Sequence, residues 1–216
     1  MTDFSIQRIE EADTEDVMRL LRRTFFIREP LNQKIGYCKS ENDDCPDMDS
    51  FCRYCLPGIS FKATDAEGNI IGVLINGVSA VNNPVDYPTL IKNCISPKFR
   101  TILQMLDIRE SGAQLGTKYP DDKELFEVKL AATDEKWGKK GVMARLLEET
   151  EKAARELGLR IMRIDTSSAY SAKAAEKIGF KCIYQRAYTD ITMNGEPMIV
   201  PDPPHIFDKV FIKELF

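Results

Sequence analysis

Residues 125–149 read LFEVKLAATDEKWGKKGVMARLLEE, and this stretch decides the fold. Its apolar start predicts a strand from Leu125 to Ala131, and apolar residues at helical spacing predict a helix from Val142 to Leu157. Between them lies a turn with glycines, Gly138 to Gly141. A helix that begins directly after such a turn presents free backbone N–H groups and the positive end of its dipole, which suit a pyrophosphate. The segment alone also leaves open an ordinary strand-turn-helix junction.

The turn differs from the common nucleotide-binding motifs. No Gly-Lys-Ser/Thr follows at the spacing of a P-loop. The glycine spacing of a dinucleotide fingerprint is absent, as is its acidic residue after a second strand. Lys139 and Lys140 add positive charge. Any phosphate contact here is therefore expected to come mainly from backbone N–H groups.

Outward from this segment, the patterns predict alternating elements on both sides. We expect strands over residues 4–9, 59–64, 70–79, 159–165, 181–188 and 207–216, and helices over 47–56, 99–108 and 168–178. A further helix should begin at Asp13 and end near Pro30, because the residue before a proline leaves the helical region. Hairpin strands combined with a βαβ unit predict an α/β (α+β) fold. No repeat or linker interrupts residues 1–216, which favours a single domain.

Composition narrows the classes of function. The chain has 216 residues, a formal net charge of −4 and a pI of about 5.3, so it lacks the basic balance of a nucleic-acid-binding module. The first residues have no basic or apolar region of a secretory signal, and no apolar run is long enough to cross a membrane. We therefore expect a cytoplasmic protein, a monomer or weak dimer, whose six cysteines are free thiols. The only histidine, His205, rules out a multi-histidine metal site.

Two blocks resemble the GNAT superfamily of acetyltransferases. Residues 138–143, GKKGVM, are similar to its acetyl-CoA loop R/Q-x-x-G-x-G/A, with Gly141 as the strict match, Gly138 in place of Arg or Gln and Met143 in place of the small last residue. Residues 168–180 end in EKIGF and are similar to a GNAT helix that commonly reads N-x-x-A-x-x-x-Y-x-x-x-G-F. Ser168 stands where many members have Asn, and Ala175 stands where many have a tyrosine general acid. A tyrosine acid at that position is thus excluded.

This resemblance implies the GNAT fold, a central mixed, mostly antiparallel sheet of about seven strands flanked by helices. It also implies acetyl-CoA as co-substrate and no metal. The residues expected to contact acetyl-CoA are Leu130, Ala131, Ala132, Gly138, Lys139, Lys140, Gly141, Val142, Met143, Ala144 and Ser168.

Two shorter stretches resemble the insect arylalkylamine N-acetyltransferases, the dopamine N-acetyltransferase group. Residues 28–32, REPLN, are similar to its E-P-L-N signature, and residues 166–171, TSSAYS, to its S-S-x-Y-S stretch. The resemblance implies Glu29 as general base, assisted by Ser167 and Ser171. The expected acceptor is a small amine such as dopamine, tyramine, octopamine, serotonin or tryptamine, acetylated by direct transfer in a ternary complex.

The chemistry requires groups of this kind. A primary amine has a pKa near 10.4 and is mostly ammonium at neutral pH, while only its neutral form attacks a thioester. A carboxylate with a raised pKa, here Glu29, can take the proton directly or through water. Ser171 would return a proton to the leaving thiolate, with Ser167 positioning it. Backbone N–H groups near residues 130–132 could stabilise the oxyanion.

Other interpretations stay open. Glu29 could be a solvated residue at a helix end, and Ser167 or Ser168 a helix cap. Polyamine acetylation, protein acetylation or a non-catalytic acyl-CoA-binding module are alternative functions. For several further residues a structural role competes with a functional one. These are the Cys52–Cys55 pair (zinc or buried thiols), the acidic residues 41–49 (attraction of amines or a solvated loop), Trp137 (packing) and His205 (structure).

Overall fold

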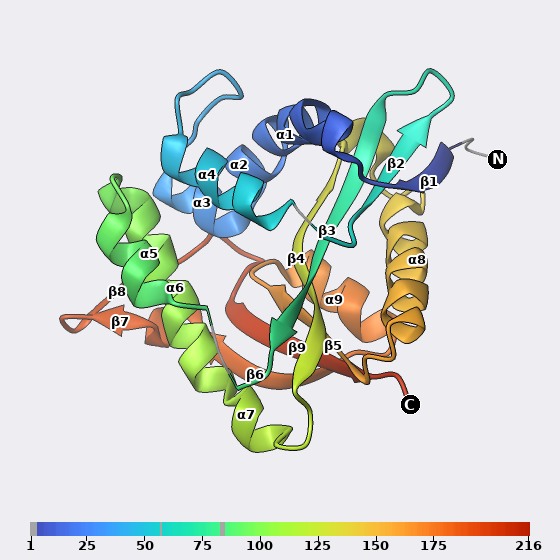
Figure 1. Ribbon diagram of the computed structural model, residues 1–216. Coiled ribbons are helices and arrows are strands. Elements are labelled where there is room, and N and C mark those ends of the chain that lie inside the picture. Colours follow the sequence, from blue (N-terminus) through green and yellow to red (C-terminus); the bar gives the residue numbers. More distant parts are fainter. Residues whose placement is uncertain (1–3, 57, 83–84) are drawn as a thin grey trace.

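A seven-stranded sheet in the order β1-β2-β3-β4-β5-β9-β6 runs through the centre of the molecule (Figure 1). The computed structural model describes residues 4–56, 58–82 and 85–216. Only β4 and β5 are parallel neighbours, and all other neighbours in this sheet are antiparallel. Its strands are β1 (Phe4–Arg8), β2 (Phe61–Asp65), β3 (Ile70–Ala80), β4 (Glu124–Thr133), β5 (Ile161–Thr166), β6 (Lys181–Ala187) and β9 (Phe207–Glu214). The predicted mixed, mostly antiparallel sheet of about seven strands, flanked by helices, is confirmed.

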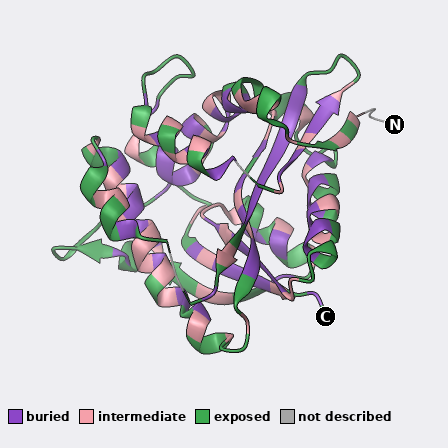
Figure 2. Cartoon of the chain, in the orientation of Figure 1, coloured by how far each residue is buried: buried purple, intermediate pink, exposed green. Residues whose placement is uncertain are grey.

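Helices cover both faces of the sheet. The helices are α1 (Thr14–Arg23), α2 (Phe25–Arg28), α3 (Pro30–Ile35), α4 (Pro46–Cys55), α5 (Tyr87–Asn93), α6 (Pro97–Ala113), α7 (Leu115–Lys118), α8 (Val142–Glu156) and α9 (Ala169–Lys177). Helices α1 to α4 and α6 pack with β3 and β4 in one buried cluster, and α8 and α9 pack against the opposite face in another. Figure 2 shows the result: buried residues follow the strands, while the helices carry buried and exposed residues side by side.

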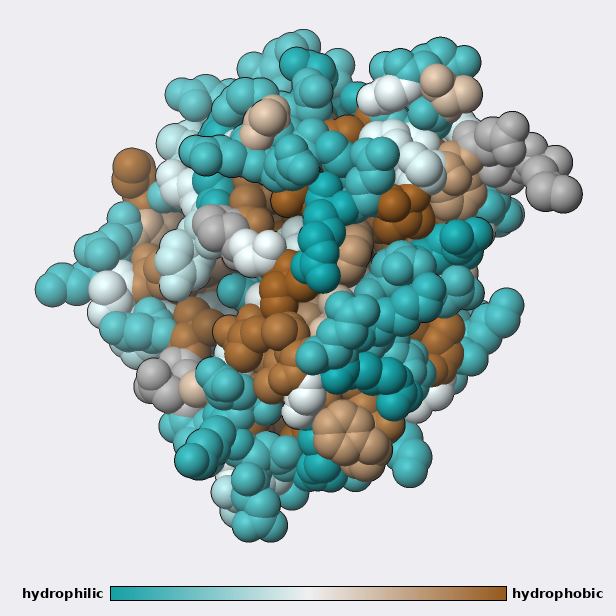
Figure 3. Space-filling model, turned by 45° about the vertical axis from the view of Figure 1, so that its right-hand side comes forward, coloured by the Kyte–Doolittle hydropathy of each residue, from teal (hydrophilic) through white to brown (hydrophobic). Residues whose placement is uncertain are grey.

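Apolar side chains also reach the surface. On the face shown in Figure 3 they gather near the middle, surrounded by hydrophilic residues. Within the described part of the chain, no helix has both the length and the apolar character that a membrane crossing needs.

Strand β4 contains a bulge that changes which face its side chains occupy. Ile75 of β3 pairs with Leu130, but the next residue, Asn76, pairs with Val128, so Lys129 is the extra residue. Val128 packs with the α8 side, whereas Leu130 packs with the α1 side. Pairing between β4 and β5 is present only up to Val128 and Ile164. Beyond that point the two parallel strands diverge, and the edge of β4 has no strand partner on the β5 side among the described residues.

The predicted helix from Asp13 to about Pro30 is wrong as a single element. It is broken at Thr24 (φ −122°, ψ −79°), where α1 ends and α2 begins. The Thr24 hydroxyl donates to the Leu20 carbonyl oxygen at 2.5 Å, a contact that competes with regular helix bonding. Pro30 then starts α3 at its first position, where a proline needs no N–H. These two interruptions place Glu29 at a junction between helices.

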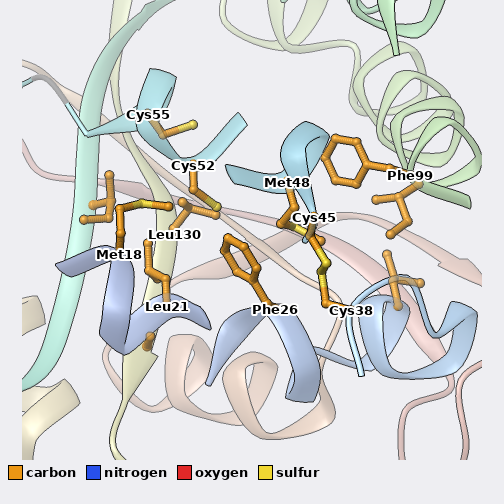
Figure 4. Packing of buried hydrophobic residues seen from close by; sticks show 14 of the residues in the cluster. Met18, Leu21, Phe26, Cys38, Cys45, Met48, Cys52, Cys55, Phe99 and Leu130 are labelled. Atoms are coloured by element: carbon orange, nitrogen blue, oxygen red, sulfur yellow. A yellow bond between two sulfur atoms is a disulfide. The ribbon is translucent and has the colours of Figure 1, made fainter. Parts of the chain in front are cut away.

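The expectation of six free thiols is also wrong. Cys38 and Cys45 form a disulfide within the α1–α4 side of the core (Figure 4). Gly36 ends α3 in the left-handed conformation, and the loop returns so that the two Cα atoms lie 6.2 Å apart, within the range a disulfide spans. Cys52 and Cys55 lie buried on α4 as free thiols. Free Cys94 is buried and free Cys182 exposed.

Other differences are local. The helix predicted over residues 99–108 extends over Pro97–Ala113, because Ser96 caps its start by accepting from the Phe99 N–H at 3.4 Å. A short hairpin of β7 (Thr192–Met193) and β8 (Glu196–Pro197) has no counterpart in the prediction. Three 3₁₀ turns, at Glu11–Asp13, Glu135–Trp137 and Tyr188–Asp190, complete the described elements.

Candidate functional site

Glu29 joins two segments that lie far apart in sequence. It is the N-cap of α3, and its Oε2 accepts from the Asn32 N–H at 2.8 Å. Its Oε1 accepts a hydrogen bond from the Ser167 hydroxyl. Ser167 directly follows β5, so the fold brings together the two stretches that carry the arylalkylamine acetyltransferase resemblance. Glu29 is therefore both a helix cap and part of a side-chain pair.

The surroundings of Glu29 alter its acidity. Burial raises the pKa of the Glu29 carboxyl above its ordinary value. The hydrogen bonds from Ser167 and Asn32 and the nearby Arg109 charge act in the opposite direction but do not cancel burial. A carboxylate with a raised pKa is a stronger base than an exposed glutamate, and it is protonated at a higher pH.

The turn that carries the serines is held by several hydrogen bonds. Ser168 caps α9 by accepting from the Tyr170 N–H at 3.1 Å, and the Ser171 hydroxyl donates to the Ser168 carbonyl oxygen at 2.9 Å. His205 Nδ1 accepts from the Ala169 N–H at 3.1 Å, which agrees with the structural role predicted for it. The Tyr188 hydroxyl donates to the Ser167 carbonyl oxygen at 2.9 Å. Of the predicted serines, Ser167 contacts Glu29, Ser168 is a cap, and Ser171 bonds within the turn.

Two cavities meet at the Glu29–Ser167 pair, and both residues line both of them. The larger, about 470 Å³, lies between the diverging ends of β4 and β5 and the first turns of α8 and α9. The predicted site residues that line it are Glu29, Leu130, Ala131, Ala132, Met143, Ser167, Ser168 and Ser171. Tyr170 also lines it and is exposed.

A third cavity, about 330 Å³, continues this groove at the start of α8 and shares Thr133 and Met143 with it. The predicted residues here are Gly138, Lys139, Gly141, Val142, Met143 and Ala144. Gly141 has φ +83° as the N-cap of α8 and leaves the first N–H groups of this 15-residue helix without a side-chain cap. Lys140 is not among the residues that line this cavity, and its ammonium lies 4.7 Å from the centroid of the Trp137 ring.

The smaller cavity at Glu29, about 150 Å³, has a different character. Its aromatic lining residues are Phe25, Phe51, Tyr54, Tyr87 and Phe99, and its charged ones are Glu29, Arg109, Glu127, Lys129 and Asp165. Most of the remaining lining is aliphatic. Such an apolar space with a few charged groups suits a small ligand that has one hydrocarbon part and one polar end.

Beside this cavity lies a buried ionic network that the sequence did not predict. Arg109 donates to Asp208 at 3.0 Å and lies 3.2 Å from Asp165. Arg163 also binds Asp165, at 2.8 Å, and Glu110, at 2.7 Å. Burial raises the pKa of Asp208 to about 6, although Arg109 counteracts part of that effect. Arg109 and Asp208 are 99 residues apart, and no local pattern joins them.

The acidic stretch does not contribute to the Glu29 site. Glu41, Asp43 and Asp44 are exposed, and they line a separate cavity. Asp49 binds Arg22 and Arg53, and Asp47 accepts from the backbone N–H groups of residues 95 and 96. The interpretation as a loop in solvent therefore fits residues 41–44. Among the described residues no cluster of three or more His, Cys, Asp or Glu is arranged to hold a metal ion.

Comparison with known proteins gives the wider relationship. No known family model matches the sequence. Arylalkylamine N-acetyltransferase 2 from Aedes aegypti has the same architecture, with a TM-score of 0.91 and 26% identity over 99% of this chain and 100% of that one. A Drosophila melanogaster polyamine N-acetyltransferase, which forms N-acetylagmatine, has a TM-score of 0.85 and 21% identity over 98% and 100% of the two chains. A putative acetyltransferase from Salmonella typhimurium with its cofactor acetyl-CoA has a TM-score of 0.57 and 13% identity, covering 99% and 95%.

The fold, the diverging β4 and β5, and these likenesses define the chain as a member of the GNAT superfamily. Within that superfamily its structure is similar to those of insect arylalkylamine N-acetyltransferases. The neighbours indicate an acetyltransferase of the arylalkylamine or polyamine type.

Proposed function

We propose that the chain transfers the acetyl group of acetyl-CoA directly to a small arylalkylamine, with Glu29 as general base. The observation that carries the proposal is the Glu29–Ser167 pair at the meeting point of two cavities. The larger cavity has the lining expected for the thioester end of acetyl-CoA, and the smaller cavity has the lining expected for an aromatic amine. An acid–base group between two such cavities can act on a nitrogen and a carbonyl carbon held on either side.

The groove from β4 to the start of α8 fits acetyl-CoA. The unpaired edge of β4 at residues 130–132 offers backbone groups to an amide-containing chain. The start of α8 offers free N–H groups and the positive helix dipole to a pyrophosphate, with Lys139 lining the same space. Acetyl-CoA would supply the activated acetyl group, and the chain would hold it with the thioester near Glu29.

Glu29 has the properties that the proton transfer needs. An amine whose pKa lies three units above the pH costs roughly 4 kcal/mol to deprotonate without assistance. The raised pKa of Glu29 lowers that cost, because the proton moves to a stronger base. The Ser167 hydroxyl, fixed through its carbonyl by Tyr188, orients the carboxylate. Backbone N–H groups at residues 130–132 would stabilise the oxyanion.

Ser171 would donate a proton to the leaving thiolate. It lines the larger cavity, and among the described residues its hydroxyl is bonded only to the Ser168 carbonyl oxygen, so it can reach a sulfur there after a side-chain rotation. Ser168 would contribute as the cap that holds this turn.

The aromatic lining of the smaller cavity favours an arylalkylamine. Five aromatic residues are among those that line a space of about 150 Å³, where a ring can pack against them and a hydrated aliphatic chain gains less. The alternative is a polyamine or agmatine, for which the carboxylates of the cavity provide the supporting feature. A non-catalytic acyl-CoA-binding module is the other candidate, motivated by the departures from the GNAT loop at Gly138 and Met143.

The test is thiol release from acetyl-CoA with a panel of dopamine, tyramine, serotonin, putrescine, agmatine and a lysine peptide, read as kcat/KM. We expect the aromatic amines to be preferred. Preference for putrescine or agmatine would support the polyamine alternative, and a lysine peptide as best acceptor would indicate protein acetylation. Tight binding of coenzyme A without amine-dependent release would identify a binding module.

A glycine substitution separates cofactor binding from folding. In Gly141→Val the β-branched side chain must adopt φ +83°, which costs about 1–3 kcal/mol and disturbs the start of α8. We expect calorimetry to show an affinity for coenzyme A at least about tenfold weaker. The matched control is Gly195→Val, because Gly195 has φ +86° and equally open space but lies in the β7–β8 turn. It should lose similar stability and keep its affinity. Equal affinities in both variants would contradict the placement of the pyrophosphate.

A further inference from the structure

The smaller cavity at Glu29 contains two charged side chains that the proposed reaction does not use. Glu127 and Lys129 both belong to β4 and both line this cavity. The other charged residues there are already engaged, since Glu29 binds Ser167 and Asn32, and Arg109 pairs with Asp165. In contrast, neither Glu127 nor Lys129 forms an ion pair with any described residue. Their charges are therefore available to a ligand.

Glu127 has one oxygen free to accept a hydrogen bond. Its Oε2 accepts from the Ser79 hydroxyl, which fixes the carboxylate, and its Oε1 has no hydrogen-bond partner among the described residues. A carboxylate is an acceptor only, with room for several donors. Glu127 thus presents a positioned acceptor to the cavity.

Lys129 is held next to this acceptor by the shape of β3. Gly77 lies directly opposite Glu127 in the β3–β4 pairing. A Cβ at Gly77 would meet Lys129 Cε at 2.6 Å and Nζ at 2.9 Å, so the end of the lysine side chain packs over the glycine. The missing side chain at Gly77 makes room for the ammonium beside Glu127. A donor and an acceptor therefore lie together on one wall.

A hydroxyl group fits such a pair. It can donate to Glu127 and accept from Lys129 at the same time. A polyamine or agmatine substrate would instead place a second ammonium or a guanidinium at this wall. That group would also bind Glu127, but the like charge of Lys129 would repel it at close range. Glu127 and Leu130 pair with Gly77 and Ile75, which are two residues apart on β3, and a strand rises about 3.3 Å per residue, so Glu127 lies about 7 Å along the sheet from Leu130 at the Glu29 end. This separation is comparable with the length of an arylethylamine from its nitrogen to the far side of its ring.

We propose that Glu127 and Lys129 recognise a hydroxyl group on the ring of the amine substrate. The proposal rests on the proposed function and narrows it to hydroxylated arylalkylamines. It also assigns Gly77 and Ser79 as residues that position the pair.

The experiment compares tyramine with 2-phenylethylamine, which differ only in the ring hydroxyl. For the wild type we expect kcat/KM to favour tyramine by about tenfold to hundredfold, the range for a hydrogen bond to a charged group. In Glu127→Gln, which removes the charge of the acceptor, the ratio should fall toward one, because kcat/KM for tyramine should drop more than kcat/KM for 2-phenylethylamine. Gly77→Ala, which displaces the lysine, should lower the ratio partly. Glu124→Gln, an exposed carboxylate on the same strand, is the control and should keep the wild-type ratio.

Each other outcome has a defined meaning. A wild-type ratio near one, or an unchanged ratio in Glu127→Gln, overturns the proposal. A loss in Glu127→Gln that is confined to agmatine shows that the carboxylate recognises a cation, and it also overturns the proposal. If no amine is acetylated at all, the proposed function fails. In that case calorimetry should measure the affinities of tyramine and 2-phenylethylamine for the wild type and for Glu127→Gln. The ratio of the two affinities then tests this inference in the same way as the ratio of kcat/KM values.

Discussion

Glu29→Gln is expected to lower kcat/KM for amine acetylation by about 10²- to 10⁴-fold at neutral pH, the usual contribution of a general base. Glutamine keeps the size of the side chain, and its carbonyl oxygen can still cap α3 by accepting from Asn32. The change therefore removes the base and leaves the helix junction in place. Affinity for coenzyme A should be unchanged, because Glu29 lies at the end of the groove and not along it.

The pH profile provides a second readout. Burial raises the pKa of Glu29, so wild-type activity should fall with decreasing pH at a higher pH than an exposed glutamate would give. Glu29→Gln should lack this acidic limb, and its residual rate should rise with pH as more amine becomes neutral. Asp86→Asn is a matched control, since Asp86 caps α5 by accepting from Thr89 and is exposed. A Glu29→Gln variant with wild-type kcat/KM and an intact acidic limb would refute the assignment of the base.

Arg109→Met should reduce the free energy of unfolding by about 3–5 kcal/mol, as expected when one partner of a buried ion pair is removed. The side chains of Arg109, Asp208 and Asp165 are only 10%, 2% and 17% exposed. Without Arg109, Asp208 would lose its ion-pair partner and Asp165 would keep only Arg163, and neither carboxylate would gain water. Denaturant unfolding measures the change. Arg19→Met is the control, because the Arg19–Asp16 pair is 66% and 57% exposed and should contribute at most about 1 kcal/mol.

The cost of Arg109→Met should depend on pH. The pKa of Asp208 in the folded protein is about 6, above its value in an unfolded chain, so its contribution to stability is complete at low pH and is lost as the pH rises through 6. Without Arg109 this carboxyl becomes still harder to ionise. The destabilisation should therefore be smaller at pH 5 than at pH 8. A cost that is independent of pH would show that the arginine acts through packing alone.

The sequence predicted those parts of the fold that depend on local patterns. The strand before residue 133, the turn and α8 follow from apolar periodicity, and every residue expected to contact acetyl-CoA except Lys140 lines the resulting groove. Glu29 and Ser167 were found through resemblance, and the structure places them in contact. Lys140 instead lies over the Trp137 ring, because a lysine beside a tryptophan can stack on its ring as readily as point into a loop.

The remaining features depend on contacts between distant segments. At the break the Thr24 hydroxyl bonds to the carbonyl oxygen of the preceding turn, and because threonine also occurs inside unbroken helices, the residue type alone does not predict a break. The Cys38–Cys45 bond requires a loop conformation that spacing does not fix. The Arg109 network and the wall made by Glu127 and Lys129 require the sheet register, including the bulge at Lys129. Charged residues in a strand are usually exposed, so no pattern marked them as cavity residues.

The dual role of Glu29 has an evolutionary consequence. Because the same carboxylate begins α3 and serves as the proposed base, an apolar replacement would weaken the helix start as well as the chemistry. A descendant that lost catalysis but kept folding would be confined to the few side chains that can accept from the Asn32 N–H, such as Asn, Asp, Ser or Gln. Inactive paralogues should therefore retain a polar residue at this position, and sequencing of gene duplicates would reveal it.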